Sequence, residues 1–385
     1  MQHHEQVRLL ERARLLVGRG ETDLDLPGGT IPVDRYIDAA RLEQERERLF
    51  GRLPILVGFT SQLRAAGDWF TDDATGVPIL CVRGDDGKVH AFLNVCRHRG
   101  SRLVTGTAGS ARTFSCGFHG WTYDLAGALC KVPLPAAFPD LDRNACGLVE
   151  LPTGERHGFV FVVPKARGAA MPDLDTFLGP LLAELGSFGL GDFTATRIAT
   201  QTRRLNWKLH MDATQEVYHL PHLHATTAGA GYFQGCSLLT HTAPHARMVM
   251  PGASVLGLRD DDRAQWRLLT HAAVVYAMFP NTTLLLHDGF VQMLSVFPID
   301  PDTSLVRTAM LVPPGPADAA EEHRRVCHHA LYLSTMAEDL AACEQMQANM
   351  RTGANAVLRL GRAEGLVAAF DRTVDDLLEP DRRTH

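Results

Sequence analysis

The chain has 385 residues, of which 45% are hydrophobic and 21% charged, as in an ordinary globular protein. This length exceeds what one core usually organises, so we expect two domains. The net charge of −6 argues against a protein that binds nucleic acid or an anionic membrane. No apolar run approaches the roughly 18 residues that span a bilayer, and the N-terminus lacks the apolar core of a signal peptide. We therefore expect a cytoplasmic protein.

The first half of the chain changes character near residue 50. Residues 1–50 are rich in charged residues with helical spacing and are expected to form a helical lead-in that packs on the C-terminal domain. Residues 51–165 contain short apolar runs bounded by turns. The runs 79–82 and 89–93 flank Gly-Asp-Asp-Gly, a pattern that predicts a β-hairpin. We therefore predict a small all-β domain over 51–165.

A segment rich in Pro, Gly and Ala, residues 164–172, is expected to connect this domain to the next. Helical and strand patterns then alternate to the C-terminus. Strands are predicted over 194–202, 266–279, 282–287, 290–298 and 305–312. Helices are predicted over 207–220 and 317–351 and from Ala363 onward. The pattern predicts an α+β domain over 172–385, an antiparallel sheet with helices packed on it.

Two short motifs in the β-rich segment combine thiol and imidazole side chains. They are Cys96-Arg97-His98 and Cys116-Gly117-Phe118-His119. In the usual zinc finger, one motif supplies two cysteines and the other two histidines. Here each motif supplies one cysteine and one histidine. This interleaving suits a [2Fe–2S] cluster in which one iron takes both thiolates and the other both imidazoles. Structural zinc is the alternative.

A second set of histidines follows the predicted connector, at His219 and His224. Pro221 is expected to break the helix between them, so that His224 can turn back towards the same metal ion. His222 would suit an unbroken helix and is a competing candidate, and His210 is a weaker one. Glu216 lies three residues before His219 and would share its helix face. Two imidazoles need one carboxylate to complete the facial triad of a non-haem Fe(II) oxygenase.

These motifs closely resemble those of the Rieske ring-hydroxylating oxygenase alpha subunit family, and the resemblance covers most of the chain. Residues 94–100 and 116–124 are similar to its cluster loops, although Gly117-Phe118 replaces the common Pro-Tyr. Residues 206–224 resemble its mononuclear-iron motif. Residues 338–344 resemble its Glu-Asp-x4-Glu segment.

The resemblance implies a residue-by-residue assignment. A [2Fe–2S] cluster would be held by Cys96, His98, Cys116 and His119, and Fe(II) by His219, His224 and Asp339. Glu338 and Glu344 are the alternatives to Asp339. Glu216 would hydrogen-bond a cluster histidine of the next subunit in a homotrimer and carry electrons between the two centres; many relatives have Asp there. The fold implied is an N-terminal all-β Rieske domain followed by a helix-grip-like catalytic domain.

The implied activity is O₂-dependent monohydroxylation, dihydroxylation or oxidative demethylation of an apolar or aromatic small molecule. The sequence contains no nucleotide-binding glycine motif, so electrons are expected from a separate NAD(P)H reductase, with or without a ferredoxin. A small beta subunit is compatible with this arrangement. Candidate pocket residues are Met248, Val249, Met250, Leu256, Leu258 and Phe290. The alternative functions are a Rieske-type electron carrier, a zinc hydrolase and a non-catalytic family member.

Overall fold

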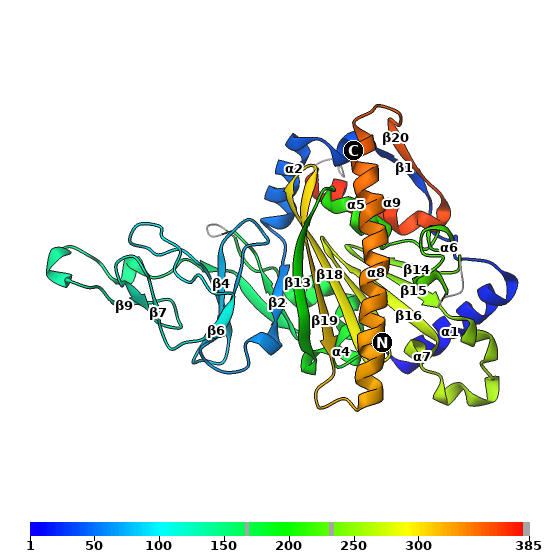
Figure 1. Ribbon diagram of the computed structural model, residues 1–385, viewed down its shortest axis with the longest axis horizontal. Coiled ribbons are helices and arrows are strands. Elements are labelled where there is room, and N and C mark those ends of the chain that lie inside the picture. The colour runs from blue at the N-terminus through cyan, green and yellow to red at the C-terminus, as the bar shows by residue number, and fades with distance from the viewer. Residues whose placement is uncertain (166–168, 231–234, 380–385) are drawn as a thin grey trace. The chain divides into compact units, whose positions relative to one another are not determined.

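The computed structural model describes residues 1–165, 169–230 and 235–379 (Figure 1). Contacts within the chain divide it into two units. The first, called the β unit here, comprises Glu47–Phe177 with Leu190–Asp192, and the second, the α+β unit, comprises the rest of the described chain. Among the described residues, no helix has both the length and the apolar character needed to cross a bilayer.

The β unit consists of short strands in three antiparallel sheets, in the orders β10-β5-β4-β3-β6, β11-β12-β2 and β7-β8-β9. Strands β4 and β5 form the predicted hairpin, with Ile79 opposite Leu93 and Arg83 opposite Val89. The strands are β2 Ile55–Phe59, β3 Asp68–Asp72, β4 Ile79–Arg83, β5 Val89–Leu93, β6 Ala108–Ser110, β7 Phe114–Ser115, β8 Thr122–Tyr123, β9 Leu129–Lys131, β10 Glu150–Leu151, β11 Thr153–Arg156 and β12 Phe159–Val162.

The α+β unit is built on a seven-stranded antiparallel sheet in the order β13-β19-β18-β17-β16-β15-β14. Every residue of β15 and β16 is buried; β16 is continuously apolar, whereas β15 also buries His245 and Arg247. The strands are β13 Thr194–Arg203, β14 Leu238–Thr242, β15 His245–Pro251, β16 Ala272–Met278, β17 Thr282–His287, β18 Phe290–Asp300 and β19 Thr303–Val312.

A single long helix, α8 (Ala319–Met350), runs across this sheet (Figure 1). It begins where the Asp318 side chain accepts a hydrogen bond of 2.7 Å from the backbone N–H of Glu321, an ordinary N-terminal cap. The helix predicted from Ala363 is α9 (Gly365–Leu378). The combination of an antiparallel sheet and covering helices confirms the predicted α+β class.

The N-terminal residues belong to the α+β unit through several elements. Strand β1 (Gly29–Pro32) pairs with β20 (Val357–Leu360) near the other end of the chain. Helix α1 (His3–Arg19) contacts α7 (Leu268–His271) and β14, and α2 (Ala39–Glu45) contacts α9. Residues far apart in sequence therefore enclose the same sheet.

Two local predictions were wrong. The helix predicted over 207–220 is two pieces, α5 (Trp207–Ala213) and α6 (Leu220–Leu223), and the break lies before Pro221. Pro221 stands in the first turn of α6, where its missing N–H costs nothing. The strand predicted over 266–279 begins only at Ala272, because residues 268–271 form the helical turn α7.

Candidate metal centres

The two Cys/His loops of the β unit have the same backbone turn. The backbone carbonyl of Cys96 accepts a hydrogen bond of 3.0 Å from the N–H of Gly100, and the backbone carbonyl of Cys116 accepts one of 2.9 Å from the N–H of Gly120. Both glycines adopt left-handed conformations, with φ of 78° and 69°. Because a side chain is strained at such φ values, glycine allows each loop to close tightly on itself.

The thiols and the imidazoles of these loops have different surroundings. Cys96 and Cys116 are each only 3% exposed. His119 is exposed and His98 half-buried, and the centroids of their rings are 4.6 Å apart. The Tyr123 hydroxyl lies 3.4 Å from the Cys96 sulfur. The loops therefore bring two sulfur and two imidazole groups together, with the sulfurs inside and the imidazoles towards the surface.

The chemistry of these groups fits a [2Fe–2S] cluster. Burial acts to raise the pKa of the Cys116 thiol, but hydrogen bonds from the backbone N–H of Phe118, the side chain of Cys96 and the backbone N–H of His119 lower it overall. Such donors stabilise the thiolate form, which is the form that binds iron. The Nδ1 atom of His98 is buried and has no hydrogen-bond partner among the described residues. A buried, unbonded imidazole nitrogen is what a metal ligand leaves when the ion is absent.

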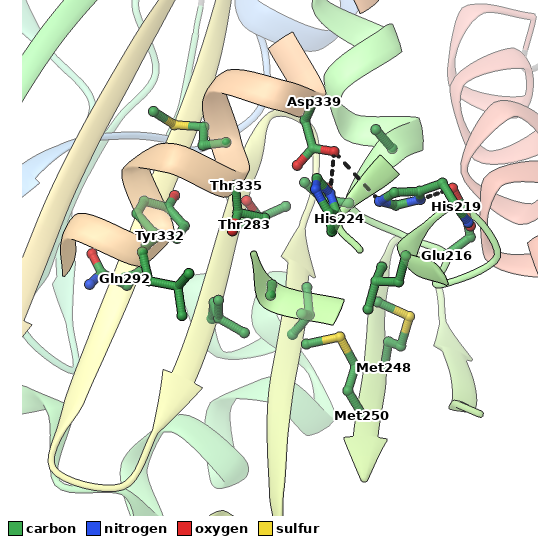
Figure 2. A pocket seen from close by; sticks show the side chains of 18 of the residues that line it. Glu216, His219, His224, Met248, Met250, Thr283, Gln292, Tyr332, Thr335 and Asp339 are labelled. Atoms are coloured by element: carbon green, nitrogen blue, oxygen red, sulfur yellow. Dashed lines mark hydrogen bonds and ion pairs between the residues drawn. The ribbon is translucent and has the colours of Figure 1, made fainter. Parts of the chain in front are cut away.

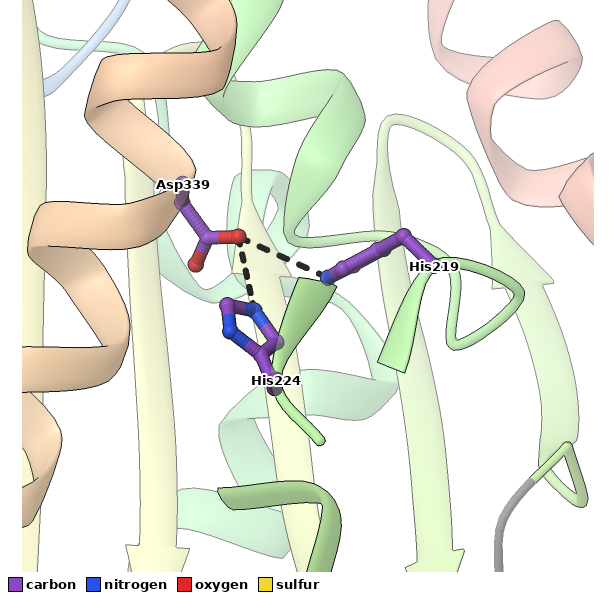
Figure 3. A group of neighbouring side chains, drawn as sticks. All are labelled: His219, His224 and Asp339. Carbon is purple, nitrogen blue, oxygen red and sulfur yellow. Dashed lines mark hydrogen bonds and ion pairs between the residues drawn. The ribbon is translucent and has the colours of Figure 1, made fainter. Parts of the chain in front are cut away.

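The second centre lies in the α+β unit, between α6 and α8. His219 and His224 flank α6 directly, and Asp339 projects from α8 (Figure 3). The Asp339 carboxylate lies 2.8 Å from Nε2 of His224 and 3.5 Å from Nε2 of His219. One potential ligand atom from each residue lies within 4.8 Å of the other two. Two imidazoles and one carboxylate that converge in this way fit the facial triad that binds non-haem Fe(II).

Each of the two imidazoles has a carboxylate behind it. Glu216 contacts Nδ1 of His219, and Glu338 lies 2.6 Å from Nδ1 of His224. Glu338 also accepts a hydrogen bond of 2.7 Å from the hydroxyl of Thr227. Carboxylates in this position fix the tautomer and the orientation of a ligating histidine, so both Nε2 atoms are directed to the same point.

The structure also places the competing candidates. The side chain of His222 is exposed and does not join the group formed by His219, His224 and Asp339. Glu344 forms a salt bridge of 2.8 Å with Arg203, and Glu338 lies behind His224. The assignment of the ligands stays a prediction, but the geometry favours the three residues named from the resemblance.

His210 was underestimated from the sequence. It is 1% exposed, and neither ring nitrogen has a hydrogen-bond partner among the described residues. Burial lowers its pKa to about 4, so the ring is neutral. It lines the same cavity as His219 and His224. The residues next to His210 in sequence do not indicate that it is buried, because the burial arises from the packing of α5 against α8.

A cavity of about 350 Å³ opens beside the three candidate ligands, within the usual range for small-molecule sites (Figure 2). Its floor is the sheet and one wall is α8. Of the predicted pocket residues, Met248 and Met250 line it, whereas Val249, Leu256, Leu258 and Phe290 do not. Other lining residues are His210, Ala213, Thr214, Leu220, Ala228, Val275, Thr283, Leu285, His287, Gln292, His328, Leu331, Tyr332, Thr335 and Met336.

A second cavity, of about 430 Å³, shares Ala213, Glu216, His219 and Asp339 with the first. Its remaining walls come from β20 and the start of α9, and from further residues of α5, α6 and α8. His219 and Asp339 therefore border both cavities, whereas His224 lines only the first. Glu216 lines both of them, and its side chain is 12% exposed.

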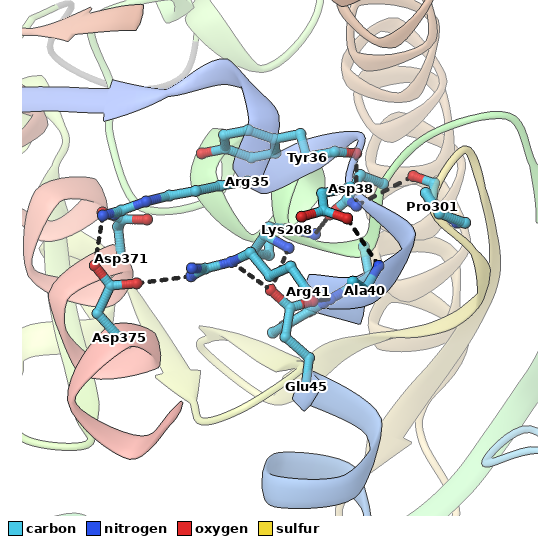
Figure 4. A network of polar contacts seen from close by, with 12 residues as sticks. Arg35, Tyr36, Asp38, Ala40, Arg41, Glu45, Lys208, Pro301, Asp371 and Asp375 are labelled. Carbon is cyan, nitrogen blue, oxygen red and sulfur yellow. Dashed lines mark hydrogen bonds and ion pairs between the residues drawn. The ribbon is translucent and has the colours of Figure 1, made fainter. Parts of the chain in front are cut away.

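Helix α5 is held in place by a buried charged group at its start (Figure 4). The Glu45 carboxylate lies 2.6 Å from the ammonium of Lys208 and accepts a hydrogen bond of 2.8 Å from the Trp207 indole. Arg41 lies 3.2 Å from the same carboxylate. The Asn206 side chain caps the helix by accepting from the backbone of Lys208. The Asn-Trp-Lys triplet therefore has a structural role, since it fixes the segment that leads to His219.

The other end of α5 carries Asp212. One oxygen of its carboxyl group accepts a hydrogen bond of 2.7 Å from the Tyr36 hydroxyl, and the other is buried without a partner among the described residues. Burial of the group raises the pKa of Asp212 to about 8.

Comparison with known families identifies both units. Residues 54–149 match the family model described as the Rieske [2Fe-2S] domain, and residues 192–380 match that of the ring hydroxylating alpha subunit (catalytic domain). Over 145 residues the chain is 41% identical to the alpha subunit of biphenyl 2,3-dioxygenase from Rhodococcus jostii. The matched segment is 37% of this chain and 31% of that subunit. Over 190 residues it is 33% identical to the oxygenase subunit of glycine betaine monooxygenase from Chromohalobacter salexigens, covering 49% and 42%.

The matched segments therefore span less than half of the length of these curated relatives. Solved structures extend the likeness in fold. The quaternary ammonium Rieske monooxygenase CntA, in complex with an inhibitor, has a TM-score of 0.79 at 21% identity, covering 92% of this chain and 96% of that one. Naphthalene 1,2-dioxygenase from a Rhodococcus species has a TM-score of 0.76 at 18% identity, covering 97% and 98%. The predicted fold class is confirmed.

Proposed function

The chain belongs to the Rieske ring-hydroxylating oxygenase alpha subunit family, and from that premise we propose that it is the terminal oxygenase of a multicomponent system. The reaction is the O₂-dependent hydroxylation or oxidative demethylation of an apolar or aromatic small molecule. The observation that carries this proposal is the presence in one chain of two complete donor sets, one for a [2Fe–2S] cluster and one for Fe(II).

The proposed domains are a lead-in over 1–50, a Rieske domain over 51–165 and a catalytic domain over 172–385. Cys96, His98, Cys116 and His119 would hold the cluster, and His219, His224 and Asp339 the iron. When bound, the cluster supplies single electrons and the iron supplies the site where O₂ reacts. The protein's own contribution is to direct three ligand atoms to one point, to orient the imidazoles through Glu216 and Glu338, and to hold the substrate in the adjoining cavity.

We propose that electrons pass between subunits of a homotrimer, with Glu216 joining His219 to a cluster histidine of the neighbouring subunit. The support is that Glu216 lines a second cavity as well as the first, so a partner can approach it without entering the substrate site. On the β unit, His119 is exposed, as are the apolar Phe118 (59%) and Leu134 (79%). Exposed large apolar side chains beside a functional group are typical of a binding surface.

A separate reductase, directly or through a ferredoxin, is the proposed electron donor, and a small beta subunit is compatible with the arrangement. The proposed location is the cytoplasm. The support for the location is that none of the eight cysteines, all within the described residues, forms a disulfide, as is usual in a reducing compartment.

The cavity favours a neutral apolar substrate over the quaternary ammonium compounds named for CntA. Among the described residues that line it, the acidic ones are Glu216 and Asp339, which are assigned to the metal centre, and none is Lys or Arg. A quaternary ammonium compound that also carries a carboxylate, such as the L-carnitine bound in another CntA structure, would leave that carboxylate without a cationic partner there. This is costly in a partly buried site. Met248 and Met250 instead provide the adaptable apolar surface that suits an aromatic or aliphatic body.

Metal and sulfide analysis of the purified protein tests the proposal. The terminal oxygenase should contain ~3 iron and ~2 acid-labile sulfide per chain, whereas an electron carrier would contain ~2 iron. Oxygen uptake with a surrogate reductase, screened over aromatic and aliphatic compounds, should depend on the compound added. One zinc per chain without sulfide would contradict the proposal, and so would a full complement of iron with no substrate-dependent uptake.

A further inference from the structure

Gln292, on β18, places an unused hydrogen-bond donor in the cavity. Its side chain lines the cavity but the residue is only 1% exposed. The amide oxygen lies 3.1 Å from Nδ1 of His329, which fixes the plane of the amide. Its amino nitrogen has no hydrogen-bond partner among the described residues. A buried donor without an acceptor is rare and destabilising, so the position indicates a ligand that supplies the acceptor.

The position of this donor is set by α8. Its partner His329 and the candidate ligand Asp339 are both on this helix, ten residues apart, which corresponds to about 15 Å along the axis. Figure 2 shows Gln292 and Tyr332 on one side of the cavity and His219 and Glu216 on the other. The donor therefore lies at the end of the cavity remote from the metal centre.

Uncharged polar side chains line the cavity beside Gln292. The Thr335 hydroxyl is buried without a partner among the described residues and lines the cavity between the two ends. His287 also lines it, and burial lowers the pKa of its imidazole to about 4, so that the ring is neutral. No Lys or Arg is among the described residues that line the cavity, so a carboxylate or phosphate would meet no cationic side chain on its wall.

We propose that the substrate is a neutral, mostly apolar molecule with one acceptor oxygen, in a carbonyl, ether or hydroxyl group, at the end opposite to the oxidised carbon. The amino group of Gln292 donates a hydrogen bond to that oxygen. Gln292 is then a specificity-determining residue, and the apolar body extends past Thr335 towards the metal ligands. This inference rests on the proposed function, because it assigns the cavity to the substrate.

Two probes of nearly equal shape test the proposal. They are 4-acetylbiphenyl, which has a carbonyl acceptor, and 4-isopropylbiphenyl, which has none. Binding is measured by equilibrium dialysis against the reduced, anaerobic holoenzyme, so that no turnover is needed. The wild-type protein should bind the ketone about tenfold more tightly than the hydrocarbon, the effect expected of one buried hydrogen bond that satisfies a waiting donor.

Gln292→Met keeps the length and volume of the side chain but removes the donor. It should abolish the preference for the ketone and leave the affinity for the hydrocarbon within about twofold. Gln201→Met makes the same replacement on β13 of the same sheet, outside the cavity, and should keep the preference. Gln292→Asn retains an amide but withdraws it by one methylene, and should lose most of the preference.

Three results would overturn the proposal. They are equal affinity of the wild-type protein for the two probes, binding of neither probe, and a Gln292→Met variant that folds and keeps the preference. The first does not depend on the folding of any variant. Because dialysis reports binding alone, these results are distinct from a failure of the proposed function, which would appear as missing iron or sulfide or as the absence of substrate-dependent O₂ uptake.

Discussion

At the residue scale, the pair His219 and His224 is fixed by a single helical turn, with His222 between them facing outwards. We expect His224→Ala to lose about one iron per chain and all oxygenation while the visible spectrum of the cluster is unchanged, because only one of the two donor sets is damaged. His222→Ala is the matched control, since it alters an exposed imidazole in the same turn. Iron analysis and O₂ uptake measure both variants; loss of iron from the control alone would show that the ligands were assigned wrongly.

Glu216 offers a second test at this scale. Glu216→Gln keeps the shape of the side chain and one acceptor oxygen but removes the charge. We expect both metal centres to be retained and the cluster to be reduced normally. Electron transfer to the second centre should be slower by orders of magnitude, which stopped-flow absorbance of the cluster measures after substrate and O₂ are added. If iron is lost instead, Glu216 is needed to hold the ion through His219.

The cluster ligands and the two iron-binding histidines could be predicted from the sequence because they lie in short, characteristic motifs, whereas Asp339, distant in sequence, came from the family resemblance. The same reasoning named His210 only as a weaker candidate ligand and missed Gln292 and Thr335. Each of these acquires its role only when α5, β18 and α8 meet, and no local pattern distinguishes them from other buried or surface side chains. Leu256 and Phe290 were named as pocket residues because they are apolar, but an apolar side chain has many other places to be buried.

At the scale of elements, α5 depends on the buried carboxylate of Glu45. Glu45→Gln would leave Lys208, 2% exposed, without its counter-charge, and removing one partner of a buried pair typically costs about 3–5 kcal/mol. We expect a correspondingly lower unfolding temperature and weaker iron binding, since α5 leads into the ligand loop. Glu43→Gln, on α2 like Glu45, affects a side chain that is 68% exposed and should change stability by less than about 0.5 kcal/mol. Scanning calorimetry distinguishes the two, and equal effects would contradict this role for Glu45.

Asp212, on α5, predicts a dependence of the free energy of unfolding on pH. Burial raises the pKa of Asp212 to about 8, whereas the unfolded chain releases this proton near pH 4. Between these values the folded state binds more protons than the unfolded state, so the free energy of unfolding falls as pH rises. Asp212→Asn keeps an acceptor for Tyr36 and removes the titration. Calorimetry should find the variant more stable by several kcal/mol, up to about 5, at pH 8, because each unit of pKa difference is worth about 1.4 kcal/mol, and nearly equal to the wild type at pH 4; equal stability at both would refute the buried acid.

Most elements of the sheet could be predicted because their strands are apolar runs bounded by turns, and α8 because of its length and its preceding prolines. The division of 207–220 into α5 and α6 could not. Helical propensity is continuous there, and the chain leaves the helix at Thr214 so that Glu216 and His219 can approach each other outside helical geometry. Tertiary contacts determined the boundary, as they often do when propensity is a weak constraint.

At the scale of the whole molecule, the proposed transfer between subunits predicts complementation. A Cys116→Ser variant lacks a competent cluster, and a His224→Ala variant lacks a competent iron site. Each homotrimer should be inactive, whereas verified hybrid trimers should recover part of the activity, because an intact cluster then adjoins an intact iron site on a neighbour. O₂ uptake after mixing and reassembly measures this. Inactive hybrids, or full activity of a strict monomer, would exclude the route between subunits.

The cavity has a wall that is a single rigid helix, with His329 at one level and Asp339 at another. A helix changes little in length, so the separation between the donor of Gln292 and the metal ligands is nearly constant. A substrate whose oxygen is bound by Gln292 therefore extends a fixed distance towards the metal ligands. The carbon that reaches the metal is the one at that distance from the oxygen within the substrate. Homologous compounds that differ by one methylene would then be attacked at carbons the same distance from the oxygen. Under the proposed function, regioselectivity would thus be a property of helical rise and not of electronic activation of any one position in the substrate.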